Sequence, residues 1–332
     1  MLRVFTTFSG YDSQCLAINR LGIEYDLVGW SEIDQYAIMA HNVLFPQFKE
    51  RNYGNICDID WSKVPDFDLF TYSSPCQDIT SMGNGKGLEE NSGTRSSLLW
   101  YCKNAIIEKH PKFLLMENVS AIVNSKFKPY FDKWVDFLSE QGYYNKWAIL
   151  DAVDYGVPQR RKRLFLLSSL KPINEDPFHP DSFTYKTVRD ILEDDVDDNL
   201  WLDKDKADTV INRNIDKIKT LSESGYNPVL YDDFNNRITK DQNNVGTLTR
   251  NMGIKTLING HKLIYKDEDW WKIRPYTQNE CMTLMGLTPE EAQKLNSASS
   301  GISSTQIFKL LGNSIVVDCM IPIFRYVSEN NC

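Results

Sequence analysis

The first 170 residues alternate short apolar runs with amphipathic stretches, and this alternation restricts the fold more than any other feature. Between the runs, apolar residues recur at helical spacing, for example Phe127, Phe131, Trp134 and Leu138. Strands that alternate with helices form parallel βαβ units, so we predict an α/β fold with a doubly wound sheet. The runs with the length and composition of strands span residues 2–7, 26–31, 67–72, 112–116, 145–150 and 164–168.

The composition is that of a folded intracellular protein. Of the 332 residues, 42% are hydrophobic and 25% are charged, which excludes a disordered or coiled-coil chain. No apolar stretch reaches the ~20 residues that cross a bilayer, and the N-terminus lacks the apolar core of a signal peptide. We therefore expect a cytoplasmic protein without a membrane partner. The 7 cysteines form no Cys-x-x-Cys pair and there are 4 histidines, so we expect free thiols and no metal site.

The pattern changes at about residue 171. Prolines and Asn- and Asp-rich turns replace the alternation of strands and helices up to about residue 272. A helical pattern returns at 277–287, and an apolar block follows at 305–328. We therefore expect a first domain at 1–170, a smaller irregular domain at 171–272, and a segment at 273–332 that returns to the first domain.

The net charge of -8 does not by itself exclude a nucleic-acid partner, because the charge is unevenly distributed. Residues 189–208 hold nine acids and three bases, whereas residues 156–172 hold five bases and no acid. The second segment can form a local basic patch that meets phosphates, or it can be a solvated basic turn.

Polar side chains follow several predicted strands at the point where each strand ends. The first strand is followed by residues 8–12, the second by Glu32, the third by residues 74–77, and the fourth by residues 117–119. Open parallel sheets bind ligands at the carboxyl ends of their strands, so we expect an active site at this edge.

The turn after the first strand has features of a nucleotide-binding turn. Gly10 is present, but Asp12 and Ser13 stand where the full Gly-x-Gly-x-x-Gly pattern needs further glycines, which disfavours a bound pyrophosphate. Glu32 suits hydrogen bonding to ribose hydroxyls, and Asp58-Ile59 suits contact with an adenine. These residues predict a nucleoside ligand without phosphates, with S-adenosylmethionine as the natural choice. The alternative for Glu32 is an ordinary surface acid.

Cys76 has the setting of a nucleophile. It follows Pro75 at a strand end and precedes a glycine-rich loop at 81–97 that can close over a substrate. Glu117, at the end of the neighbouring strand, is placed to donate a proton or a hydrogen bond. The absence of a suitably placed histidine disfavours a papain-like hydrolase.

Five motifs together resemble those of the DNA (cytosine-5) methyltransferase family. They are Pro-Cys-Gln at 75–77, Glu-Asn-Val at 117–119, the stretch 155–163 that contains Gln-Arg-Arg-Lys-Arg, the segment 274–286, and Gly-Asn-Ser-Ile-Val-Val at 312–317. They occur in family order and cover residues 1–170 and 273–325. The main departure is Asp12-Ser13, where the family usually has glycines.

The resemblance implies a Rossmann-like methyltransferase sheet and a covalent mechanism. Cys76 would add to C6 of a flipped-out cytosine, and Glu117 would contact N3 and the exocyclic amine. Arg163 would hold the base carbonyl, and Arg161 the site around it. C5 would then receive a methyl group from S-adenosylmethionine, with no metal involved. Methylation of tRNA cytosine and a catalytically silent DNA-binding paralogue are the alternatives.

The resemblance also implies the binding surfaces. Double-stranded DNA would be the partner of a monomer, residues 171–272 would recognise the target sequence, and a cognate restriction endonuclease, if one exists, would act separately. Arg237 and Arg250 are candidates for contacts with bases or phosphates, or else ordinary surface residues, and Gln77 and Arg95 are further candidates for DNA contacts. The cofactor pocket would be lined by Phe8, Ser9, Gly10, Tyr11, Glu32, Ile33, Asp58, Ile59, Pro75 and Asn313.

Overall fold

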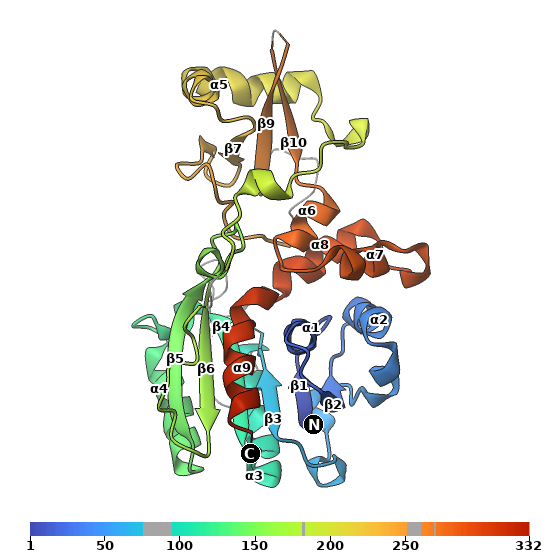
Figure 1. Cartoon of the computed structure of the whole chain (residues 1–332), viewed down its shortest axis with the longest axis vertical. Helices are drawn as coiled ribbons and strands as arrows, with labels where there is room; N and C mark the ends of the chain where they lie inside the picture. Colours follow the sequence, from blue (N-terminus) through green and yellow to red (C-terminus); the bar gives the residue numbers. More distant parts are fainter. Residues whose placement is uncertain (76–94, 181–182, 251–259, 269, 332) are drawn as a thin grey trace. The chain divides into compact units, whose positions relative to one another are not determined.

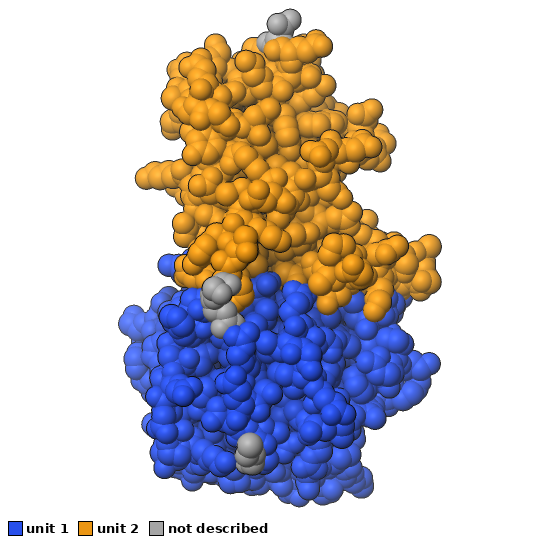
Figure 2. Space-filling view, viewed as in Figure 1, with its two compact units in different colours: residues 1–151, 162–182, 317–332 blue, residues 152–161, 183–316 orange. Residues whose placement is uncertain are grey.

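The computed structural model describes residues 1–75, 95–180, 183–250, 260–268 and 270–331. The chain forms two compact units (Figure 2). Unit 1 contains Met1–Asp151, Lys162–Ser182 and Val317–Cys332, and unit 2 contains Ala152–Arg161 and Phe183–Val316. Cys76, Gln77 and the side chain of Arg95 lie outside the described residues, so their predicted roles stay predictions.

Unit 1 is built on a six-stranded sheet in the order β2-β1-β3-β4-β6-β5. The predicted strands are confirmed, each to within a few residues. The first four strands run parallel to one another, which brings their carboxyl ends to one edge. The strands are β1 (Leu2–Thr7), β2 (Tyr25–Ser31), β3 (Leu69–Tyr72), β4 (Phe113–Val119), β5 (Tyr144–Asp151) and β6 (Lys162–Ser169).

The predicted α/β fold is confirmed, and β6 runs opposite to the other strands of this sheet. β6 pairs antiparallel with both β4 and β5. A parallel crossover needs a dozen or more residues, usually with a helix, whereas residues 152–161 alone connect β5 to β6. The apolar run of β6 is buried on both faces, and such a run predicts burial but not direction.

Helices cover both faces of this sheet. In Figure 1, α9 (Ile321–Glu329) lies in front of the strands, and it contacts α1 (Ser13–Arg20). On the other face, α3 (Cys102–Lys109) and α4 (Lys128–Glu140) bury Ile106 and Trp134 against strand residues such as Leu114. The apolar face predicted for residues 127–138 is the face that α4 buries. α2 (Gln35–Leu44) follows β2 and ends close to the 3-10 helix Pro46–Arg51.

Unit 2 is more regular than the sequence predicts. An antiparallel sheet in the order β10-β9-β7-β8 packs against the 20-residue helix α5 (Lys204–Glu223). Ile211, Val229 and Ile264 belong to the small apolar core between them. The strands are β7 (Val229–Asp232), β8 (Arg237–Ile238), β9 (His261–Asp267) and β10 (Trp270–Pro275).

Three helices that follow the sheet of unit 2 in the sequence also belong to unit 2. α6 (Gln278–Thr283), α7 (Pro289–Asn296) and α8 (Ser304–Asn313) belong to unit 2, and the chain returns to unit 1 only at Val317. Among the described residues, Ser304–Glu329 is the one stretch long and apolar enough to cross a membrane. It is broken into α8, a 3-10 turn and α9, and 67% of its most apolar window is buried inside the protein, as expected for core helices.

Candidate active site

The loop between β1 and α1 has an unusual backbone. Phe8, Gly10 and Asp12 have φ values of 53°, 58° and 67°, in the left-handed region. Glycine adopts this region freely, and a Cβ atom at Gly10 would meet nothing within 4 Å, so conformation rather than space favours glycine there. The loop therefore leaves open space above Gly10 at the carboxyl edge of the sheet.

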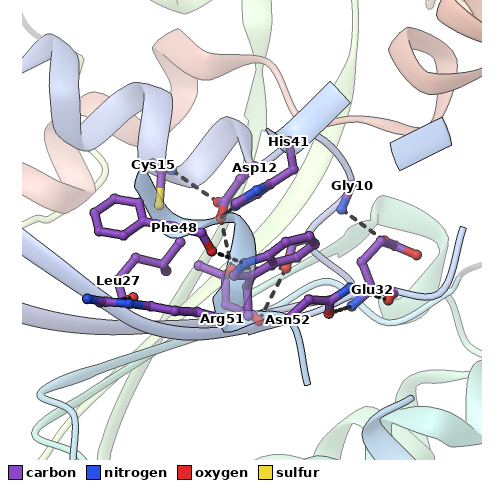
Figure 3. A network of polar contacts seen from close by, with 12 residues as sticks. Gly10, Asp12, Cys15, Leu27, Glu32, His41, Phe48, Arg51 and Asn52 are labelled. Carbon is purple, nitrogen blue, oxygen red and sulfur yellow. Dashed lines mark hydrogen bonds and ion pairs between the residues drawn. The ribbon is translucent and has the colours of Figure 1, made fainter. Parts of the chain in front are cut away.

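Glu32 ties this loop to the end of β2 (Figure 3). Its Oε2 accepts the N–H of Gly10 at 2.9 Å, and its Oε1 accepts the N–H groups of Ile33 and Asp34 at 2.8 and 2.9 Å. The side chain of Asn52 holds the backbone of Glu32 through Oδ1 at 3.3 Å and Nδ2 at 3.1 Å. Each carboxylate oxygen can accept about two hydrogen bonds. Among the described residues, Oε2 accepts one, so it can still accept a ligand hydroxyl.

The other predicted cofactor positions offer both apolar and polar groups to a ligand. Ile33 is 71% exposed, although it is a large apolar residue. Asp58 is exposed, Ile59 is half-buried, and Asn55 donates to Asp58 Oδ2 at 3.0 Å. By contrast, Ser9 and Tyr11 are buried. Any contact of a bound cofactor with these two residues would therefore involve mainly their backbone.

Glu117 and Arg163 meet at the carboxyl edge of β4. Arg163 Nε lies 3.4 Å from Glu117 Oε1, and the two side chains are 18% and 11% exposed. The antiparallel register pairs Val119 with Arg163, so Arg163 lies diagonally across from Glu117 on the same face. The guanidinium therefore compensates the charge of a largely buried carboxylate that is still accessible from one side.

The chain that leads to Cys76 is fixed next to Glu117. Asn118 Nδ2 donates to the carbonyl oxygen of Ser74 at 3.2 Å, and Ser96 Oγ donates to that of Pro75 at 2.9 Å. The end of β3 is thus held beside the end of β4. Sequence reasoning assigned no role to Asn118 or Ser96. Asn118 is next to Glu117 in the motif Glu-Asn-Val, and this position was the sequence signal that could have indicated a role for Asn118.

Arg161 lies in unit 2 and is engaged by the main chain. It is 2% exposed, its Nη1 donates to the carbonyl of Leu248 at 2.9 Å, and its Nη2 donates to those of Gly312 and Ser314 at 3.0 and 2.6 Å. Gln159 Oε1 accepts the N–H of Leu248 at 2.9 Å. These contacts give Arg161 a positioning role within unit 2, and its predicted role in holding the site around the base stays a prediction.

Asn313, Arg237 and Arg250 also lie in unit 2. Gly312 allows a close approach, because a Cβ atom there would lie 2.4 Å from the backbone nitrogen of Arg250. Asn313 and Arg250 are exposed, and Arg237 is 62% exposed with its Nε 3.7 Å from Asp232 Oδ2. The other predicted cofactor residues belong to unit 1.

The family model for C-5 cytosine-specific DNA methylases matches residues 2–329. The type II methyltransferase M2.ScrFI of Lactococcus lactis subsp. cremoris is 32% identical over 98% of both chains. The orphan methyltransferase M.SssI of Spiroplasma monobiae is 30% identical over 86% of this chain and 72% of its own. The solved structure of the methyltransferase EhMeth from Entamoeba histolytica has a TM-score of 0.75 at 19% identity, and the match covers 99% of this chain and 98% of that one.

The fold, with its mixed α/β sheet, is that of solved methyltransferase structures. The chain belongs to the C-5 cytosine-specific DNA methylase family and is an enzyme of that class.

Proposed function

We propose that this enzyme transfers a methyl group from S-adenosylmethionine to C5 of a cytosine in double-stranded DNA. The observation that carries the proposal is the Glu117–Arg163 pair at the end of β4, in a chain that the family model matches over residues 2–329. The family description and the similarity to a type II methyltransferase favour DNA over RNA. We propose a monomer, with any cognate restriction endonuclease acting separately.

The cofactor would lie at the carboxyl ends of β1 and β2. Glu32 Oε2 can accept a ribose hydroxyl, exposed Ile33 offers an apolar surface to a purine, and Asp58 can accept from its amino group. The space above Gly10 fits a ligand that approaches the main chain closely. S-adenosylmethionine, when bound, would supply an electrophilic methyl group, with S-adenosylhomocysteine as the product.

The chain's own residues would activate the cytosine ring, whose C5 is a poor nucleophile. The Cys76 thiolate would form a bond to C6, and the ring electrons would move towards C5. Glu117 would hold a proton at N3, and Arg163 would bind the base carbonyl oxygen, so that both stabilise the charge that develops on the ring. After C5 is methylated, loss of its proton would release the electron pair that breaks the Cys76–C6 bond.

The target atom is not accessible inside a duplex, so the cytosine must leave the base stack, at a cost of a few kcal/mol. Unit 2 would supply the sequence recognition. Exposed Arg237 and Arg250 are the candidates for contacts with bases or phosphates, and the acidic segment 189–208 would face away from the DNA.

The covalent step is tested with duplex DNA that carries 5-fluorocytosine at the target. Fluorine there replaces the C5 hydrogen that must be lost as a proton before the Cys76–C6 bond can break. With wild-type enzyme and S-adenosylmethionine, we expect an adduct that survives denaturation, and we expect none with Cys76→Ala. An undiminished adduct with Cys76→Ala would remove Cys76 from the mechanism. Methyl transfer to tRNA but not to DNA would support the RNA alternative, and no transfer to either would support a silent paralogue.

A further inference from the structure

The buried side of the β1–α1 loop carries a carboxylate. Asp12 is 0% exposed although its backbone is left-handed, with φ 67° and ψ 59°. Its Oδ2 accepts the Thr6 hydroxyl at 2.9 Å, and its Oδ1 accepts the N–H of Cys15 at 3.2 Å, which caps α1. A left-handed backbone is uncommon outside glycine, although Asp and Asn tolerate it best, so local contacts have to hold Asp12 there.

A buried histidine faces this carboxylate (Figure 3). His41, in the last turn of α2, is 0% exposed, and its Nε2 lies 3.6 Å from Asp12 Oδ2. Neither ring nitrogen has a hydrogen-bond partner among the described residues. The ring stacks on Trp30, with centroids 3.7 Å apart and an interplanar angle of 18°. Trp30 is itself fixed, because its indole N–H donates to the carbonyl of Phe48 at 3.0 Å.

Besides His41, the titratable neighbours of Asp12 are Cys15 and Tyr25. Burial and then the Asp12 carboxylate raise the pKa of Cys15. Burial, with Cys15 and Asp12, also raises the pKa of Tyr25. Both neighbours therefore stay neutral near pH 7, and neither offsets the charge of a buried carboxylate.

The contact joins the two elements that carry the proposed cofactor residues. Asp12 ends the loop that contains Gly10, and His41 belongs to the helix that starts just after Glu32. The Gly10–Glu32 hydrogen bond ties the same two elements at the surface. The loop is thus attached to the β2–α2 segment at the proposed binding surface and in the interior, and the N–H of Ser9 also donates to the carbonyl of Ser31 at 3.3 Å.

We propose that Asp12 and His41 form a positioning pair that holds residues 8–12 in the conformation that binds the cofactor. This inference rests on the proposed function. Neither side chain touches the ligand in this account, so both act through the loop backbone and through Glu32. Loss of the pair weakens cofactor binding and leaves the rate at saturating cofactor nearly unchanged.

The test compares four variants by calorimetric titration with S-adenosylmethionine: His41→Phe, Asp12→Gly, the combination of these two, and Leu44→Ala. His41→Phe keeps a ring that can stack on Trp30 but removes Nε2, and we expect it to raise the Kd about tenfold, within the range of coupling between contacting residues. Asp12→Gly combined with His41→Phe removes the buried charge as well, so its Kd should rise by less than the product of the two single changes. The matched control is Leu44→Ala, which removes buried apolar contacts on the same helix. It should lower stability and leave the Kd unchanged.

Hydrogen exchange of the backbone amides of residues 8–12 without ligand is a second measurement. The exchange rate should rise in His41→Phe but not in Leu44→Ala. If His41→Phe does not fold, Asp12→Asn, which keeps the shape and removes the charge, replaces it in both measurements. A wild-type Kd and wild-type exchange in the variant, or equal losses in Leu44→Ala, would overturn the positioning pair. If the wild-type enzyme does not bind S-adenosylmethionine at all, the proposed function fails, and the exchange experiment still decides on the pair.

Discussion

Arg161 offers the sharpest test of how unit 2 is held together. Its guanidinium donates to three main-chain carbonyls, those of Leu248, Gly312 and Ser314, at 2.6 to 3.0 Å. Arg161→Lys keeps the charge, but a single ammonium group cannot reproduce the fork that reaches three acceptors. If one bond survives and two are lost, at about 1.5 kcal/mol for each bond to a charged group, the substitution costs about 3 kcal/mol.

That loss is a large part of the ~5–15 kcal/mol that stabilises a typical domain. It should lower the melting temperature by about 10 °C, at ~2–4 °C per kcal/mol for a domain of this size. Circular dichroism and calorimetry measure this shift directly. Arg160→Lys is the matched control, because Arg160 is exposed and pairs with Asp241 at the surface, where such pairs contribute about 0–1 kcal/mol. If Arg161→Lys melts within 2 °C of Arg160→Lys, the positioning role of Arg161 is refuted.

The remaining predictions concern chemistry, specificity and acid stability. Glu117→Gln should slow methyl transfer by ~10²–10⁴-fold in single-turnover assays and leave the Kd for S-adenosylmethionine nearly unchanged. Loss of S-adenosylmethionine binding would place Glu117 in the cofactor site instead. If Arg237 or Arg250 contacts a base, its replacement by alanine should relax the sequence preference at one position of the methylated site, at a cost of ~1–3 kcal/mol in binding. If it contacts a phosphate, the replacement should weaken binding to all sites alike. Methylome sequencing separates these outcomes, and profiles identical to wild type would make both ordinary surface residues. Burial lowers the pKa of His261 below 6.5, so the unfolded chain binds a proton before the folded one does. Stability should therefore fall as the pH falls below about 6.5, and His261→Gln should reduce this dependence in urea titrations at pH 7 and pH 5.5; an unchanged pH dependence contradicts the assignment.

The strands of unit 1 could be predicted because apolar runs separated by helical patterns are a local property of the sequence. The direction of β6 could not be predicted from its apolar run, because such runs carry no direction. The ten-residue connection at 152–161 was the available signal, since it is too short for a parallel crossover. The sheet of unit 2 was missed for a different reason. Its strands β7 and β8 span only Val229–Asp232 and Arg237–Ile238, and Asn- and Asp-rich turns separate them.

The residues of the candidate site could be predicted singly, because each lies in a motif at a strand end. Glu117 and Arg163 come from separate motifs, and the β4–β6 register brings them within 3.4 Å. The contacts of Arg161 could not be predicted, because its partners lie 87 or more positions away in segments without a shared pattern. The Asp12–His41 contact was equally hidden. It depends on α2 folding back against the loop, and no spacing rule links a turn to the end of the next helix.

The central claim is that the enzyme methylates C5 of cytosine in duplex DNA. The most direct measurement is mass spectrometry of nucleosides after incubation of duplex DNA, in parallel with tRNA, with the enzyme and S-adenosylmethionine that carries a labelled methyl group. We predict labelled 5-methyldeoxycytidine from the DNA, no labelled nucleoside from the tRNA, and no label in either with Cys76→Ala. Label on another atom of the base, or in the tRNA alone, would contradict the account.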